Sequence, residues 1–384
     1  MSFITVWIYI TSALLCCYAL LIFLYYRWFE KLKPFTVNNS AIVFKNKFSI
    51  IIPARNEAAQ IATCIESIMA NPYPTDLFEV IVVDDFSTDS TAAIVTRLKE
   101  KYSNLHIVRL AHWISSPINS YKKKAIETGI AQSTYEWIIT TDADCMVPNK
   151  WLENFDNYLQ QHHTKLVAAP VMFTYNGSAL QAFQCLDFLS LQGITAASVS
   201  AGFHSMCNGA NLCYEKEAFH SVNGFAGVDD IASGDDMLLM YKIQQAYQNS
   251  CGYLFSSDAI VQTAPMPNWT SFINQRIRWA SKASSYKDKR IFYVLLLVYF
   301  TNLFILSFLL LTVFDISSLL WFIIFVIAKT VVEWAFMNSV ARFYKLQKMM
   351  PLFLLFQPVH ITYTVIAGWL GRFGSYQWKG RTVK

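Results

Sequence analysis

The sequence predicts an α/β domain with a mostly parallel sheet, flanked by transmembrane helices on its N-terminal and C-terminal sides. Hydrophobic residues make up 54% of the 384 residues and charged residues only 15%, which is too apolar for an ordinary soluble protein. Long uncharged runs stand near both ends, whereas the middle alternates short β-branched runs with amphipathic stretches, a pattern typical of α/β domains. We therefore expect three parts, at 1–30, 45–285 and 290–384.

The first uncharged run, from Phe3 to Tyr26, is predicted to be a transmembrane anchor. At about 1.5 Å per residue it is long enough to cross the ~30 Å hydrocarbon core of a bilayer. A secretory signal peptide is the alternative, but no basic residue precedes the run, and bulky residues rather than small ones stand before Arg27. We expect an uncleaved helix.

Basic residues follow this helix and none precedes it, which predicts its orientation. They are Arg27, Lys31, Lys33, Lys45 and Lys47. Because basic residues concentrate on the cytoplasmic side of membrane helices, the N-terminus should lie outside and the central domain in the cytoplasm. The sequence thus predicts an integral protein of the cell membrane.

Three further apolar runs, at about 291–313, 316–339 and 350–371, each approach the roughly 20 residues that a spanning helix needs. Four crossings would leave the C-terminus outside. The same charge rule would keep the tail inside, because it carries Arg372, Lys379, Arg381 and Lys384. Pro351 and Pro358 interrupt the last run, so a broken or re-entrant helix is an alternative there.

Two charged residues of opposite sign, Lys329 and Glu333, stand four apart inside the third of these four runs. Residues with this spacing share one face of a helix. We expect an ion pair that faces the interior of the helix bundle.

The central domain should contain five strands and four helices, followed by an interfacial helix near 267–286. The expected strands are Phe48 to Ile52, Phe78 to Val83, Leu105 to Leu110, Glu136 to Thr140 and Lys165 to Val171. The expected helices are Glu57 to Ala70, Asp89 to Tyr102, Lys122 to Ala131 and Trp151 to Gln161. Strands that alternate with helices in this way favour a parallel sheet covered on both faces.

Charge, cysteine usage and missing motifs exclude several classes of protein. A formal net charge of +5 is too small for a nucleic-acid-binding surface. The eight cysteines form no Cys-x-x-Cys pair, so neither a zinc site nor a disulfide framework is indicated, and reduced cysteines in the cytosol are expected. The glycine-rich motifs of Rossmann dehydrogenases and of P-loop NTPases are both missing.

Polar residues follow three of the expected strands, at the sheet edge where ligands of parallel α/β domains bind. The first strand runs into Pro53, Ala54, Arg55, Asn56 and Glu57, the second into Asp84 and Asp85, and the fourth into Asp142 and Asp144. Two carboxylates at one bend offer hard oxygen ligands to Mg²⁺ or Mn²⁺ and leave room for a diphosphate. The alternative is that such aspartates only cap the next helix.

Six ordered segments of the chain resemble the family 2 glycosyltransferases of the GT-A fold, which is Rossmann-like with a mostly parallel sheet. They are Ile51 to Glu57, Val82 to Asp89, Lys124 within Tyr-Lys-Lys-Lys-Ala, Asp142-x-Asp144, Gly234-Asp235-Asp236 and Gln275-x-x-Arg278-Trp279. The flanking apolar runs, together with Trp378-Lys379-Gly380-Arg381 in the tail, resemble membrane-integrated members, which glycosylate lipids or build polysaccharides.

The resemblance implies a nucleotide pocket that is lined by Pro53, Ala54, Arg55, Glu57 and Asp85, with Asp85 facing the base and Glu57 near the ribose. It extends to two further positions, Asp84 and Lys124. Capping of the next helix remains an alternative for Asp84 and Asp85, as does a solvated helix start for Lys124. Phe86 stands where family members usually have glycine, so the turn around the base is expected to differ.

The resemblance also assigns the chemistry. Asp236, beside Asp235, would be the general base that activates the acceptor hydroxyl, and a metal on Asp142 and Asp144 would relieve the charge of the departing diphosphate. One base and one displacement imply inversion at the anomeric carbon. The alternative for Gly-Asp-Asp is an ordinary helix start.

Gln275, Arg278 and Trp279 fall at i, i+3 and i+4 and so share one helix face. By the same resemblance, Gln275 and Arg278 would meet the diphosphate, and Trp279 would form a wall for the acceptor. A helix that only rests on the membrane with a buried tryptophan is the alternative.

The sequence therefore predicts an inverting, hexosyltransferase-type glycosyltransferase that uses Mg²⁺ or Mn²⁺ and a UDP- or GDP-linked sugar. The expected partners are a lipid or glycan acceptor and membrane lipids, with no nucleic acid, and the oligomeric state is left open. Single addition to a lipid is favoured. The alternatives are a processive polysaccharide synthase and a membrane scaffold that binds a nucleotide sugar without turnover.

Overall fold

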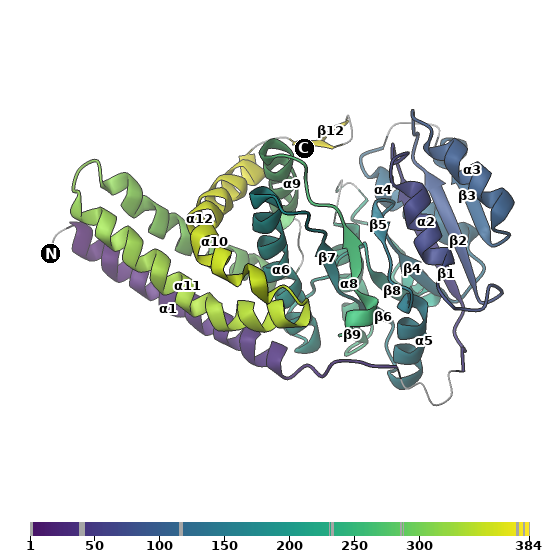
Figure 1. Ribbon diagram of the computed structural model, residues 1–384, viewed down its shortest axis with the longest axis horizontal. Coiled ribbons are helices and arrows are strands. Elements are labelled where there is room, and N and C mark those ends of the chain that lie inside the picture. The colour runs from purple at the N-terminus through teal and green to yellow at the C-terminus, as the bar shows by residue number, and fades with distance from the viewer. Residues whose placement is uncertain are drawn as a thin grey trace.

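The computed structural model describes residues 3–37, 43–114, 118–229, 231, 234–284, 286, 288–373, 376–378 and 381–383. These residues form an α/β domain and a bundle of long helices that extends away from it (Figure 1). Helices α6 (Ala179–Ser200) and α9 (Trp269–Ala280) lie between the two parts.

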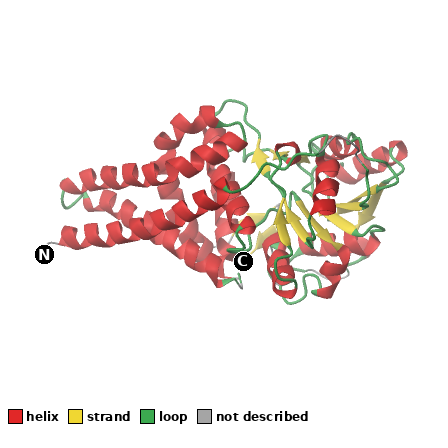
Figure 2. Cartoon of the chain, turned by 90° about the horizontal axis from the view of Figure 1, so that it is seen from below, coloured by secondary structure: helices red, strands yellow, loops and turns green. Residues whose placement is uncertain are grey.

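The main sheet has the strand order β3-β2-β1-β4-β8-β6-β9. Its parallel half consists of β1 (Phe48–Ala54), β2 (Phe78–Asp84), β3 (Leu105–Arg109) and β4 (Trp137–Thr140). The other half consists of β6 (Leu166–Ala168), β8 (Leu212–Glu215) and β9 (Cys251–Tyr253), with β8 antiparallel to both β4 and β6. Strands β1, β2 and β4 are almost wholly buried, as strands covered on both faces must be, and Figure 2 shows the sheet between helices.

The single strand expected at 165–171 is wrong, because the structure has two strands there that belong to different sheets. Strand β6 ends at Ala168, and β7 (Val171–Phe173) joins β5 (Cys145–Met146) and β10 (Val261–Thr263) in a three-stranded sheet. Pro170 stands between β6 and β7, and proline has no N–H to donate to a strand ladder. In this three-stranded sheet β5, which directly follows Asp144, pairs with β10.

Four helices of the domain lie near the expected positions: α2 (Ile61–Met69), α3 (Thr91–Lys101), α4 (Tyr121–Gln132) and α5 (Trp151–Gln161). The domain also contains α7 (Lys216–Ser221) and α8 (Asp235–Ala246), for which no range was predicted, and the short 3₁₀ turns η1 (Leu110–His112) and η2 (Ser257–Ala259). Only α2 begins clearly later than expected. The N–H of Glu57 donates to the Thr91 hydroxyl at 2.8 Å and that of Ala58 to Asp89 at 3.1 Å, so these residues form a turn beside α3.

Among the described residues, four helices are long and apolar enough to cross a membrane. They are α1 (Phe3–Glu30), α10 (Lys289–Leu311), α11 (Ser317–Phe343) and α12 (Met350–Phe373), with η3 (Ser281–Ser284) before α10 and η4 (Gln347–Met349) before α12. Helix α6 contacts α1, α11 and α12 on one side and β7 and β9 on the other, so it joins the bundle to the domain.

The last of the four helices is continuous, not broken. Pro351 lies in its first turn, where the N–H that proline lacks would have no helical acceptor, and Pro358 lies inside the helix. After α12 the short strands β11 (Tyr376–Trp378) and β12 (Arg381–Val383) pair, and β11 contacts α9 (Figure 1). The described part of the tail therefore lies on the domain side of the bundle, as its basic residues predict. Lys379, Gly380 and Lys384 lie outside the described residues.

The expected ion pair in α11 is confirmed. Lys329 Nζ lies 2.6 Å from Glu333 Oε1, and both residues are buried. Gln357 of α12 bonds both residues, and Tyr18 of α1 donates to Glu333. The pair thus ties three membrane-length helices together inside the bundle.

Candidate active site

A cavity of about 440 Å³ opens at the carboxyl ends of β1, β2 and β4, between the sheet, α8 and α9. Motif residues from chain segments that are remote in sequence all line this cavity. The predicted residues that line it are Pro53, Ala54, Arg55, Glu57, Asp85, Asp142, Asp144, Asp235, Asp236, Gln275, Arg278 and Trp279.

Two carboxylates on the loop after β4 form a donor set that suits a hard divalent cation. The ligand atoms of Asp142, Asp144 and Cys145 all lie within 4.8 Å of one another. Burial, and then the two aspartates, raise the pKa of the Cys145 thiol, and sulfur is a soft ligand that hard cations do not favour. Carboxylate oxygens are the ligands that Mg²⁺ and Mn²⁺ prefer, and the residues therefore fit the expected metal.

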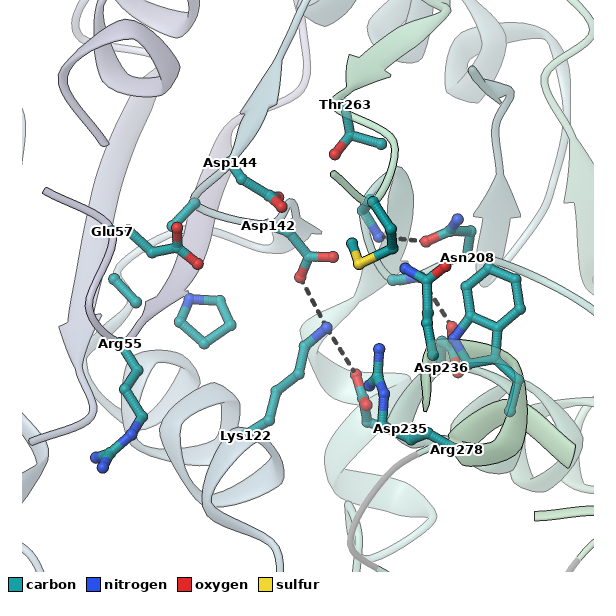
Figure 3. Close-up of a pocket in the computed structure, with 18 of the residues that line it drawn as sticks. Arg55, Glu57, Lys122, Asp142, Asp144, Asn208, Asp235, Asp236, Thr263 and Arg278 are labelled. Atoms are coloured by element: carbon teal, nitrogen blue, oxygen red, sulfur yellow. Dashed lines mark hydrogen bonds and ion pairs between the residues drawn. The ribbon is translucent and has the colours of Figure 1, made fainter. Parts of the chain in front are cut away.

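Lys122, at the start of α4, is the basic residue that lies between the carboxylates of the cavity. Its ammonium lies 2.7 Å from Asp142 Oδ1 and 3.8 Å from Asp235 Oδ2, and Figure 3 shows it between the two carboxylates. Although burial lowers the pKa of this ammonium, the carboxylates raise it well above its ordinary value. Lys122 is therefore a permanent positive charge that joins the Asp142 loop to α8.

Two other predicted residues do not line the cavity. Lys124 lies on another face of α4 and pairs with Glu127 at 3.4 Å. Asp84 is buried at the end of β2, where its carboxylate accepts from the N–H of Ser87 at 3.4 Å. The half-exposed position of Lys124 matches the solvated alternative that the sequence left open. Asp84 does not cap α3, because Ser87 stands four residues before that helix begins at Thr91. Lys122, not Lys124, lines the cavity.

The turn after β2 closes the end of the cavity that the nucleotide base is expected to occupy. Arg55 Nη1 donates to the carbonyl oxygens of Asp85 and Phe86, at 2.8 and 3.1 Å. Phe86 has a φ of 53°, in the left-handed region that glycine enters without strain, and its ring contacts Tyr121 edge to face with centroids 5.9 Å apart. The turn keeps the backbone shape that a glycine would give and adds an aromatic side chain.

Asp236 lies in the first turn of α8, at the inner end of the cavity. Its carboxylate accepts from the N–H of Gly209 at 2.9 Å and from that of Met237 at 2.8 Å. Burial, followed by the charge of Asp235, raises the pKa of Asp236, while Lys282 and Lys122 act in the opposite direction. A carboxylate with a raised pKa is a stronger base than an exposed aspartate.

Helix α9 carries the other wall of the cavity. The side chain of Asn268 caps its start by accepting from the N–H of Ser271 at 2.9 Å. From there Gln275, Arg278 and Trp279 reach the cavity lining as one helix face. Trp279 also lies against Phe188 of α6, with ring centroids 6.2 Å apart.

Several lining residues lie outside the six motif segments. Lys282 lies in η3, and burial lowers the pKa of its ammonium to about 8; its position four residues after Arg278 was the signal that could have found it. Asn208 and Gly209 also line the cavity, within a segment whose small residues suit a close approach of substrate to the backbone.

A second cavity, of about 1020 Å³, lies between α1, α6, α9, α10, α11 and α12. Most of its lining is apolar, and it shares five lining residues with the first cavity: Phe188, Asn208, Asp236, Trp279 and Lys282. The carboxylate of Asp236 therefore stands where a polar pocket meets an apolar hollow inside the helix bundle.

Comparisons with known proteins agree with this geometry. Residues 49–194 match Glycosyl transferase family 2, and residues 137–338, more than half of the chain, match Glycosyl transferase family group 2. The poly-beta-1,6-N-acetyl-D-glucosamine synthase of Staphylococcus epidermidis is 25% identical over 231 residues, which is 57% of this chain and 51% of that protein. The beta-monoglucosyldiacylglycerol synthase of a Synechocystis species is 30% identical over 129 residues, 34% of this chain and 26% of that protein.

A solved structure with the same fold is the mannosyltransferase PcManGT from Pyrobaculum calidifontis, in complex with GDP-Man and Mn²⁺. It is 18% identical, with a TM-score of 0.61, and the alignment covers 92% of this chain and 99% of that one. The chain spans about half the length of the curated relatives it matches. The GT-A fold, the ordered motifs and the matched families lead to one conclusion: this chain belongs to the family 2 glycosyltransferases and has helices suited to membrane integration.

Proposed function

We propose that the protein is an inverting, metal-dependent glycosyltransferase that adds a single sugar to a lipid acceptor. The observation that carries this proposal is the junction of the two cavities at Asp236. A polar donor pocket that opens into an apolar hollow between membrane-length helices suits an acceptor with a hydroxyl at one end and acyl or prenyl chains at the other.

The donor is a UDP- or GDP-linked sugar, bound along the edge of the sheet. Arg55, Glu57 and Asp85 hold the nucleoside, with Pro53 and Ala54 below it. Arg278 and Gln275 face the diphosphate from α9, where a planar guanidinium suits phosphate oxygens. Mg²⁺ or Mn²⁺, when held by Asp142 and Asp144, supplies positive charge to the departing diphosphate.

Asp236 removes the proton from the acceptor hydroxyl as that oxygen attacks the anomeric carbon from the side opposite the diphosphate. The bond to the acceptor oxygen forms while the bond to the diphosphate oxygen breaks, and the configuration of the sugar inverts. Trp279 borders both cavities and orients the acceptor, because a large rigid ring excludes misaligned poses.

The membrane orientation follows the charge pattern. Basic residues after α1 and in the tail favour a cytoplasmic domain. The end of α1 and the described tail strands β11 and β12 lie on the domain side of the helix bundle (Figure 1). We therefore assign the protein to the cell membrane, with its donor pocket in the cytoplasm where nucleotide sugars are made available.

Processive synthesis of a polysaccharide is the second candidate, because one relative is named as a polysaccharide synthase. A growing glycan needs polar partners for its many hydroxyl groups, whereas the hollow beside Asp236 is mainly apolar. This lining favours a lipid over a glycan chain.

The test is product analysis with the purified full chain. Release of nucleoside diphosphate is measured over a panel of UDP- and GDP-sugars with Mn²⁺ and a membrane lipid extract, and the lipids are then analysed by mass spectrometry. We expect lipids that are heavier by one sugar. Long saccharide chains would establish the synthase instead, and a donor that binds without any turnover would establish the scaffold.

A further inference from the structure

A buried ionic cluster joins α9 to the membrane helices directly behind the motif face. Its centre is the pair of Arg276 on α9 and Asp187 on α6, which are 4% and 5% exposed. Arg276 donates through Nε and Nη2 to Asp187 Oδ2, at 2.8 and 2.6 Å. The other oxygen of Asp187 accepts from the hydroxyl of Tyr363 on α12 and lies 3.7 Å from His360 Nε2.

The same guanidinium contacts the residues that line the donor cavity. Arg276 Cζ lies 4.2 Å from the centre of the Trp279 ring and 4.5 Å from that of Phe272, and Nη1 donates to Gln275 Oε1 at 2.5 Å. Gln275 and Trp279 are thus each held by a direct contact to one planar group. A lysine could not reproduce this geometry, because it lacks the planar fork and the stacking face.

We propose that Arg276 and Asp187 are positioning residues that fix Trp279 at the junction of the two cavities and Gln275 in the donor cavity. This inference rests on the transfer to a membrane acceptor proposed above. Asp187 lies outside the six motif segments, and Arg276 occupies an unspecified position within Gln275-x-x-Arg278-Trp279. Neither residue lines the donor pocket, and both line the apolar cavity. Through this pair, the positions of α6 and α12 determine the position of the Trp279 ring relative to Asp236. A displacement of about 1 Å at such a wall can cost about a hundredfold in rate.

The test is a double-mutant cycle on the purified full chain, with Arg276→Lys and Trp279→Ala alone and together. For Arg276→Lys we expect kcat per folded protein to fall about thirtyfold. The Kd for nucleoside diphosphate with Mn²⁺ should rise at most about fivefold, since Gln275 is the one contact of Arg276 that faces the diphosphate and the rest of that site stays in place. Because Arg276 acts partly through Trp279, Arg276→Lys should cost clearly less in the Trp279→Ala background than in the wild type, where the remaining loss reflects Gln275. Independent, multiplying losses would overturn the proposal, as would an unchanged kcat in Arg276→Lys.

A milder variant covers the case in which Arg276→Lys fails to fold. Tyr363→Phe keeps the ring against Phe272 and Phe183 and removes only the hydroxyl that bonds Asp187. We expect kcat to fall about fivefold at unchanged donor Kd. The matched control is Thr362→Val on the same helix, whose hydroxyl bonds only the carbonyl of Pro358, and it should leave kcat unchanged.

Equal rates in Tyr363→Phe and Thr362→Val would contradict the positioning role. The wild-type protein separates this outcome from a failure of the proposed function. If it transfers no sugar to lipid, the proposed function is wrong; if it does and the variants match it, only the positioning role is wrong.

Discussion

Two lysines of α4 that stand two positions apart have opposite surroundings. Lys122 bonds Asp142 in the donor cavity, whereas Lys124 pairs with Glu127 outside its lining. The sequence shows three lysines in a row and does not reveal which of them faces the cavity, because that depends on the rotation of the helix about its axis. The carboxylate positions could be predicted more securely, since the end of a buried strand fixes where they lie.

Lys122→Met should lower the transfer rate at least about tenfold. The change removes a charge-assisted hydrogen bond, worth about 1.5–3 kcal/mol, and leaves Asp142 and Asp235 facing each other without the positive charge between them. Lys124→Met is the matched control and should stay within about twofold of the wild type. Initial rates at saturating donor check this, and equal losses in the two variants would contradict the placement.

The raised pKa of Asp236 predicts an acid limb in the pH profile of kcat. The base works only when deprotonated, so kcat should fall as the pH drops through a value above the ordinary range of aspartate, about 3.9. The positive charge of Lys282 lowers the pKa of Asp236. Lys282→Met should therefore move the limb to higher pH, whereas Lys124→Met should not, and a limb that stays in place in Lys282→Met would contradict this assignment.

At the scale of elements, the sequence predicted those whose pattern is local. The bounds of α5, Trp151–Gln161, agree with the expectation, because an amphipathic stretch marks its own ends. The long helix α6 was not predicted. It is buried on most of its surface, so it has no polar face to give a 3.6-residue period, and no charged flanks mark it as a membrane span. The cluster at Asp187 was missed for the same reason.

Helix α11 offers a test of how the bundle is held together. Glu333→Ala removes one partner of a buried ion pair and leaves Lys329 Nζ, which is fully buried, without its carboxylate. We expect a loss of about 3 kcal/mol in the free energy of unfolding, measured by denaturation of the full chain in lipid or detergent micelles. Asp315→Asn, in the exposed turn between α10 and α11, is a control that should cost little.

An unfolding midpoint in Glu333→Ala equal to that of the control would show that the ion pair does not stabilise the bundle. A drop in transfer rate without any change in stability would instead place Glu333 in the acceptor path, since it lines the apolar cavity.

At the scale of the molecule, the sequence predicted the order of parts but not how they meet. Apolar runs and strand patterns gave an anchor, a domain and a membrane region, and the ordered motifs gave the donor side of the site. The apolar cavity could not be predicted, because five helices and α9 form it together and no single segment marks it. The sequence also left open the side on which the tail lies. In the structure α12 ends beside η3, where Gly371 packs closely against Ala280 and Ser281.

Removal of divalent cations tests the metal assignment for the whole enzyme. A chelator should abolish transfer, and excess Mn²⁺ should restore it, because the proposed function has Asp142 and Asp144 hold a cation that would stabilise the leaving diphosphate. Asp144→Asn should need a higher Mn²⁺ concentration for half-maximal rate. Full turnover in chelator would remove these two residues from the list of metal ligands.

The central claim is that Asp236 performs the chemistry where the donor pocket meets the apolar cavity, and Asp236→Asn tests it most directly. The variant keeps the size and polarity of the side chain and removes the base. In the purified full chain, we expect sugar transfer to lipid to fall at least about a hundredfold, while the Kd for the nucleotide sugar with Mn²⁺ stays within about twofold of the wild type. A variant that binds donor equally well and still transfers sugar at the wild-type rate would contradict the account.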